Sequence, residues 1–150
     1  MGQKYSTAAL HPIRHMDDYI VEIMEGVSTQ REQVLKARFA SVKVLAYEMY
    51  KDAYTLIIKL DGEMLQNPEL LWKHDLESVR IFSMGANYSF GDYSSKNLHP
   101  IRHFEKYLAE IKEANITEER KKEIKERLGI VLRLSVRLYF DAERLIRLLD

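Results

Sequence analysis

Two histidine pairs are the residues in this chain best suited to chemistry. The pentapeptide His-Pro-Ile-Arg-His occurs twice and places His11 four residues before His15, and His99 four residues before His103. Side chains four positions apart lie on one face of a helix, so each pair could chelate a transition metal. Two pairs brought together would form a four-histidine metal site.

The same motifs also fit an anion site. Arg14 and Arg102 each stand at the start of an expected helix, where free backbone N–H groups and the helix dipole attract negative charge. Two arginines with neighbouring histidines could therefore hold a phosphate or a carboxylate. The metal and anion hypotheses use the same side chains and exclude each other.

A third interpretation of the motifs is purely structural. Leu10 and Leu98 precede the two copies and would fix the angle at which the chain enters a helix. The first histidine would cap that helix, the proline would occupy its first turn and the isoleucine would enter the core. The arginine and the second histidine would then pair with acids on a neighbouring helix. This interpretation is favoured, because neither copy has the glutamate that follows the first histidine in zincins.

The sequence gives no residue-level support for catalysis. It lacks cysteine, so thiolate chemistry and zinc–cysteine sites are excluded. We find no nucleophile–base motif, no glycine-rich phosphate loop and no paired-carboxylate signature in it. We therefore do not expect an enzyme, and we expect no cofactor unless the histidine pairs bind a metal.

The similarity around the motifs extends well beyond five residues. Residues 10–26 match residues 98–114 at ten of 17 positions, and residues 29–61 match residues 118–150 at 12 of 33. Self-similarity on this scale indicates an internal duplication. We predict one helical domain over 1–150. Its parts are repeat one (10–61), an inserted helix and loop (62–97) and repeat two (98–150).

Hydrophobic spacing predicts the helices that position these residues. We expect short helices at 12–25 and 100–114, long helices at 29–60 and 118–149, and an inserted helix at 68–84. Apolar residues alternate at three and four positions along both long helices, which is the pattern of a helix–helix seam. The predicted fold is all-α: an internally duplicated antiparallel bundle of two short-helix/long-helix hairpins with an extra helix between the repeats.

Composition limits the classes of partner. Apolar residues make up 46% and charged residues 31%, with a formal net charge of zero, so we expect a soluble protein and no nucleic acid partner. No apolar run approaches the roughly 18–20 residues of a transmembrane helix. Gly2 fits a myristoylation pattern, but the pattern is too short to predict the modification. We expect a cytoplasmic protein or a component of a larger intracellular or virion-type assembly.

The two long helices differ on one face. The second carries arginines where the first carries other residues; the matched pairs are Arg133 and Val44, Arg137 and Glu48, Arg144 and Thr55, and Arg147 and Ile58. Tyr47 and Tyr54 lie near this face of the first long helix. A helix that is apolar nearly all round is covered on both sides. The 68–84 helix, a partner protein or a second copy of the chain could provide that cover.

A loop rich in tyrosine, glycine, serine and asparagine is the other candidate binding surface. It contains Tyr88, Phe90 and Tyr93, and such composition is typical of recognition loops. Alternatively, these rings pack over the end of the bundle. The sequence therefore predicts a non-enzymatic protein–protein interaction protein: a scaffold, adaptor or assembly component, or a homo-oligomer. The alternative is a metal- or anion-binding bundle built on the two histidine motifs.

Overall fold

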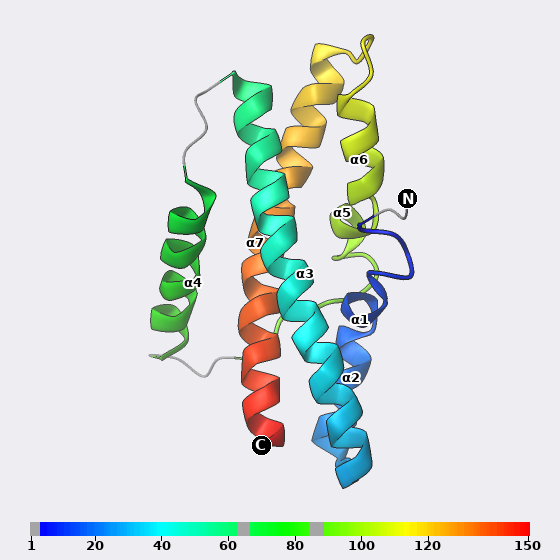
Figure 1. The fold of residues 1–150 in the computed structure, drawn as a ribbon, viewed down its shortest axis with the longest axis vertical. Helices are drawn as coiled ribbons and strands as arrows, with labels where there is room; N and C mark the ends of the chain where they lie inside the picture. Colours follow the sequence, from blue (N-terminus) through cyan, green and yellow to red (C-terminus); the bar gives the residue numbers. More distant parts are fainter. Residues whose placement is uncertain (1–3, 63–66, 85–88) are drawn as a thin grey trace.

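The computed structural model describes residues 4–62, 67–84 and 89–150, and within these ranges it contains helices and no strands (Figure 1). The all-α prediction is confirmed. The helices are α1 (His11–Arg14), α2 (Met16–Glu25), α3 (Thr29–Asp61), α4 (Pro68–Met84), α5 (His99–Arg102), α6 (Phe104–Ile111) and α7 (Glu118–Leu149). In the described part of the chain, every helix is too short or too polar to cross a membrane. Gly2 lies outside the described residues.

The long helices α3 and α7 run antiparallel through the centre of the molecule (Figure 1). Their predicted seams are buried in α7 throughout and in α3 from Leu35 to Ala53, while Leu56 and Leu60 at the end of α3 are half-buried. The buried seam residues are Leu35, Phe39, Val42, Ala46, Met49 and Ala53 of α3 and Ile124, Leu128, Val131, Ser135, Leu138, Ala142, Leu145 and Leu149 of α7. Alternating spacing of three and four residues keeps one stripe of each helix on its partner.

Side-chain hydroxyls begin both long helices. Ser28 Oγ accepts a hydrogen bond from the Arg31 backbone N–H at 3.1 Å, and Thr117 Oγ1 accepts one from the Arg120 N–H at 3.1 Å. Each bond satisfies one of the N–H groups that the first turn leaves without an intrahelical partner. Ser28 and Thr117 are therefore the N-cap residues of α3 and α7.

The short helices are interrupted after one turn, where the sequence predicted continuous helices at 12–25 and 100–114. His15, with φ −106° and ψ 12°, separates α1 from α2, and His103, with φ −105° and ψ 11°, separates α5 from α6. The predicted capping role of His11 is wrong. Leu10 occupies the position before the helix, and no side chain caps it. Each motif is therefore a separate helical turn that precedes a longer helix.

The short helices lie on one side of the α3–α7 pair and α4 lies on the other (Figure 1). From the middle of the molecule α1 and α2 run towards one end, while α5 and α6 run towards the opposite end. The two His-Pro-Ile-Arg-His turns therefore begin near each other at mid-height. Together the short helices cover one side of the α3–α7 pair, with α1 and α2 along one half and α5 and α6 along the other.

Several contacts occur in pairs whose residues are separated by 88 or 89 positions. The ion pairs of this kind are Arg31–Glu22 with Arg120–Glu110 and Lys36–Asp150 with Lys125–Asp61. The tyrosine hydroxyl bonds are Tyr5–Asp52 with Tyr93–Asp141, both at 2.5 Å. The arginine–tyrosine bonds are Arg38–Tyr19 with Arg127–Tyr107. Equivalent polar contacts therefore join α2 to α3 and α6 to α7, and equivalent ion pairs join α3 and α7 at their two ends.

Helix α4 covers part of the opposite face through a second apolar cluster. Trp72 and Leu76 of α4 are buried there against Tyr50 of α3 and against Val136 and Phe140 of α7. Along the rest of α4, Leu71 and Val79 are half-buried, while His74 is exposed and Phe82 is 75% exposed. The buried face of α4 is therefore the one that carries Trp72 and Leu76, and Phe82 lies outside that face.

Ser135 should be a site where alanine stabilises the protein. This side chain is fully buried in the α7 seam, and its hydroxyl has no hydrogen-bond partner among the described residues. An unsatisfied buried polar group costs on the order of 1–3 kcal/mol. We expect Ser135→Ala to raise the free energy of unfolding in urea by about 1 kcal/mol. The control is Ala46→Ser at the matching position of α3, which should lower it; a loss of stability in Ser135→Ala would contradict this account.

Candidate functional site

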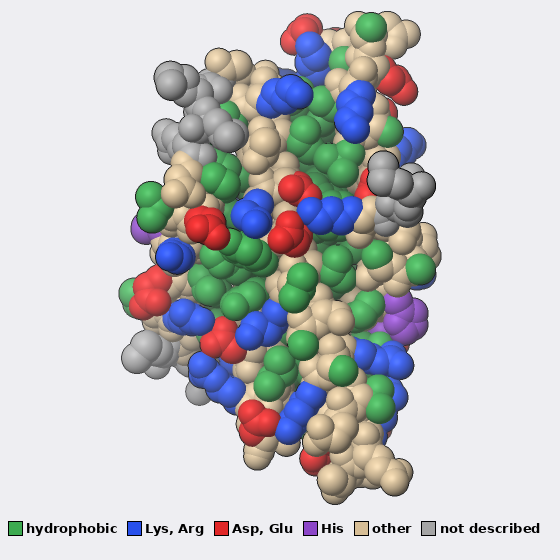
Figure 2. All heavy atoms as spheres, in the orientation of Figure 1, with side chains coloured by type: hydrophobic (Ala, Val, Ile, Leu, Met, Phe, Trp, Pro, Cys, Tyr) green, Lys and Arg blue, Asp and Glu red, His purple; other side chains and the backbone are tan. Residues whose placement is uncertain are grey.

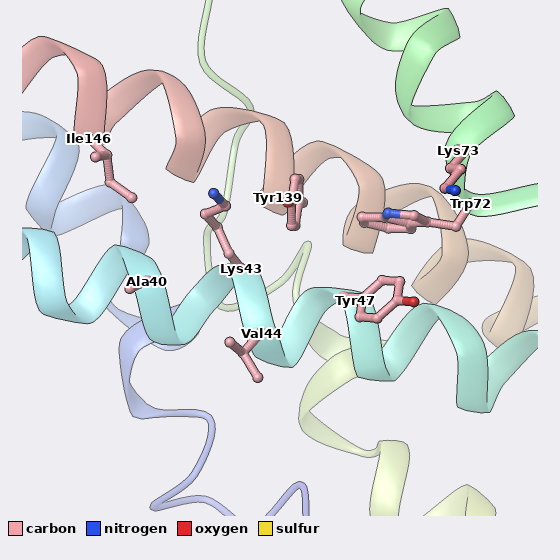
Figure 3. Close-up of a pocket in the computed structure, with 8 residues that line it drawn as sticks. All are labelled: Ala40, Lys43, Val44, Tyr47, Trp72, Lys73, Tyr139 and Ile146. Atoms are coloured by element: carbon pink, nitrogen blue, oxygen red, sulfur yellow. The ribbon is translucent and has the colours of Figure 1, made fainter. Parts of the chain in front are cut away.

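An apolar groove runs along the α3–α7 face beyond the edge of α4 (Figure 3). Its volume is about 550 Å3. The residues that line it are Ala40, Lys43, Val44 and Tyr47 of α3, Trp72 and Lys73 of α4, and Tyr139 and Ile146 of α7. Figure 2 shows apolar side chains gathered on this face between α4 and α3, with basic and acidic side chains around them. Three helices therefore contribute to one open, largely apolar surface.

Trp72 is the centre of an aromatic cluster at one end of the groove. Its ring lies 5.3 Å from Tyr47, 5.1 Å from Tyr50 and 5.0 Å from Tyr139, in edge-to-face arrangements. Such pairs stabilise beyond their buried area, because ring edges and faces carry opposite partial charges. The indole is only 5% exposed, so it is held in place by its neighbours.

Hydrogen bonds fix the tyrosines of this cluster to α4. The Tyr47 hydroxyl donates to Glu69, and the Tyr50 hydroxyl donates to Asp75. The hydrogen bond to Glu69 raises the pKa of Tyr47 to about 12, and burial with the bond to Asp75 raises the pKa of Tyr50 further. Both hydroxyls therefore act as hydrogen-bond donors that join α3 to α4 at this end of the groove.

Basic residues stand on the rim of the groove, and an apolar side chain is open to solvent inside it. Lys43 Nζ lies 5.0 Å from the centre of the Tyr139 ring, and Lys73 stands beside Trp72. Val44 is 63% exposed. A second hollow of about 500 Å3, on the α1 side, shares Ala40 and Val44 with the groove. These two residues therefore form a low apolar ridge with a hollow on either side.

Only some of the partner-binding residues predicted on α3 line the groove. Val44 and Tyr47 line the groove, whereas Tyr54 and Ile58 are each only 7% exposed and do not line it. Sequence reasoning missed Lys43, Lys73 and Trp72. The available signal was that Trp72 is the only tryptophan and belongs to the helix without a counterpart in the other repeat.

The tyrosine loop is largely part of the core where it is described. Tyr93 is 1% exposed and donates its hydroxyl proton to Asp141. Phe90 is half-buried, with the guanidinium of Arg144 4.6 Å from its ring centre. Tyr88 lies outside the described residues. Burial of Tyr93 removes that ring from any binding surface and supports the alternative in which the loop packs on the bundle.

The histidines of each motif contact each other in pairs. The His11 and His15 rings are 4.3 Å apart between centres, as are the His99 and His103 rings. His15 Nδ1 lies 3.2 Å from Asp18 on its own helix. Within residues 4–62, 67–84 and 89–150, no three histidine, cysteine or acidic side chains are grouped to hold a metal ion. The four-histidine site is therefore not formed.

The arginines of the two motifs do come together. Arg14 and Arg102 line one hollow of about 250 Å3 with Thr7, Leu10 and His103. The expected pairing of these arginines with acids on a neighbouring helix is not found in the described structure. Arg102 instead donates to the Ser95 carbonyl oxygen at 3.1 Å.

Comparisons with known proteins found no match for this chain. No family model matches the chain, and neither the curated proteins nor the solved structures that were compared with it give a match.

Proposed function

We propose that this chain is a non-enzymatic protein–protein interaction protein, a scaffold, adaptor or assembly component, that binds an amphipathic helix of its partner in the groove. The observation that carries the proposal is the open aromatic and apolar groove bordered by Lys43 and Lys73. Contiguous exposed apolar surface with a polar rim is typical of interaction sites. An amphipathic helix lying in a hydrophobic groove is a common mode of peptide recognition.

The lining specifies the chemistry of the partner helix. Apolar side chains at positions i, i+3 or i+4, and i+7 would contact Val44, Tyr47 and Tyr139 along the floor. Acidic side chains flanking that stripe would meet Lys43 and Lys73 on the rim, where charge complementarity favours encounter and register. Because Trp72 and the tyrosines are already fixed, little side-chain entropy is lost on binding.

We also infer that the frame carrying the groove is the internally duplicated pair of short-helix/long-helix hairpins predicted from the sequence. The matched ion pairs Arg31–Glu22 and Arg120–Glu110 support this inference, as do the matched hydroxyl bonds to Asp52 and Asp141. Related halves would explain why α4, which has no counterpart, is the element that shapes the groove.

The single tryptophan provides a direct test. Trp72 lines the groove, so its fluorescence reports on occupancy without any label. The probe is a designed helical peptide with a leucine stripe flanked by glutamates, compared with the same peptide flanked by lysines. We expect the glutamate peptide to shift Trp72 emission saturably. It should bind at least about tenfold more tightly than the lysine peptide, because the lysine peptide repels the lysines on the rim instead of pairing with them.

Variants on the surface of α3 localise the interaction. Val44→Glu places a carboxylate in the groove and should weaken binding of the glutamate peptide at least about tenfold, because burying an unpaired charge costs more than 1.4 kcal/mol. The matched control is Val34→Glu, an exposed valine of the same helix outside the groove, which should leave binding unchanged. Equal binding by both variants would refute the groove as the site. If the chain forms a dimer in light scattering that Val44→Glu dissociates, the occupant is a second copy instead.

A further inference from the structure

We propose that the hollow between the two His-Pro-Ile-Arg-His motifs is a phosphate-binding site. Its lining takes Arg14 from the first motif and Arg102 and His103 from the second, together with Thr7, which carries a hydroxyl. Guanidinium groups bind phosphate oxygens through two parallel hydrogen bonds, and this geometry makes arginine a preferred phosphate ligand. The site shares no lining residue with the α3–α7 groove and is independent of the function proposed for that groove.

Among residues 4–62, 67–84 and 89–150, no acidic side chain lines this hollow to balance its positive charge. In the described part of the structure the Arg14 side chain makes no hydrogen bond or ion pair, and the Arg102 side chain donates to the Ser95 carbonyl oxygen. Two arginine side chains border this one small hollow, and an anion placed between them would be attracted by both positive charges.

Neighbouring residues add to the positive potential. The pKa of His103 is lowered by burial and by the nearby positive charges of His99, Arg102, Lys106 and Arg127. These groups come from α5, α6 and α7, so several elements contribute the same sign of charge around the hollow. A doubly charged anion is favoured over a singly charged one in such a field.

The donor set fits a tetrahedral oxyanion better than a planar carboxylate. Two guanidinium forks on separate turns, a hydroxyl and an imidazole can address oxygens that point in different directions. A carboxylate offers two oxygens in one plane, and a single arginine fork satisfies both. A hollow of about 250 Å3 has room for a phosphoryl group with a small substituent.

Calorimetric titration with inorganic phosphate, with acetate as the carboxylate probe, tests the proposal. We expect phosphate to bind in the millimolar range or more tightly, and acetate to bind more weakly. Arg14→Gln and Arg102→Gln should each weaken phosphate binding about tenfold, since each removes charge-assisted hydrogen bonds. The matched control is Arg133→Gln, an exposed arginine of α7 outside this hollow, which should bind phosphate like the original chain.

A second measurement locates the bound ion without mutation. Phosphate should move the imidazole resonances of His103 in the nuclear magnetic resonance spectrum and raise its pKa, because a bound dianion stabilises the imidazolium. Circular dichroism of each variant checks that the helices are intact. Absence of phosphate binding, acetate binding of equal strength, or unchanged phosphate affinity in both arginine variants would each overturn the proposal, whatever the groove experiment gives.

Discussion

Replacing Asp141 with alanine should lower the free energy of unfolding by about 3–5 kcal/mol, measured by urea denaturation. The Asp141 side chain is fully buried, and one of its oxygens accepts hydrogen bonds from the Tyr93 hydroxyl at 2.5 Å and from the Gly91 N–H at 2.9 Å. Alanine would leave the buried Tyr93 hydroxyl and the Gly91 N–H without their acceptor. The chain is closely fitted at this point, because a Cβ added to Gly91 would lie 2.9 Å from the Tyr93 ring.

The matching carboxylate on α3 is the control for this experiment. Asp52 accepts a hydrogen bond from the Tyr5 hydroxyl at the same 2.5 Å, but its side chain is 37% exposed. Because water can replace part of the hydrogen bonding that Asp52 supplies, we expect Asp52→Ala to lower the free energy of unfolding by only about 1 kcal/mol. Equal losses at the two positions would mean that burial of Asp141 is not the cause of its larger effect.

Replacing Trp72 with alanine should lower the free energy of unfolding by about 3–5 kcal/mol, because it deletes the largest side chain of the α4 cluster and leaves a cavity. Three tyrosine rings contact the indole within 5.3 Å between centres. The loss is measured by circular dichroism during urea unfolding, because the variant has no tryptophan. Hydrogen exchange should become faster across α4 and stay slow along the α3–α7 seam.

An exposed aromatic residue of the same helix separates the cavity effect from a general sensitivity of α4. Phe82 is 75% exposed, and we expect Phe82→Ala to change the free energy of unfolding by less than about 0.5 kcal/mol. Uniformly faster exchange over α3, α4 and α7 in Trp72→Ala would show that the α4 cluster and the central seam unfold as one unit, contrary to this expectation.

Local patterns predicted the frame well. The bounds of α4 coincide with the predicted 68–84 helix, and the long helices depart from their predicted ends by at most one residue. Their seams followed from apolar spacing alone, because a period near 3.5 residues is a property of one helix. The breaks at His15 and His103 did not follow, since proline and histidine there are equally compatible with an uninterrupted helix.

The sites depend on contacts between distant segments, and local spacing carries little information about them. The Tyr93 hydroxyl bonds to Asp141, 48 residues away, and the groove combines residues of α3, α4 and α7. One signal was available: Tyr5 and Ser6 stand at the same spacing from the first motif as Tyr93 and Ser94 do from the second. That match extends the similarity upstream of Leu10 and marks both tyrosines as parts of the fold.

The position of α4 in the chain has a consequence for how this molecule can diversify. It lies in the connection between α3 and the second motif, and the entropic cost of closing such a connection grows only with the logarithm of its length. Insertions, deletions or substitutions there should disturb the α3–α7 frame little, while they reshape one wall of the groove. The α3–α7 frame can therefore be kept constant while the surface of the groove changes through one replaceable helix.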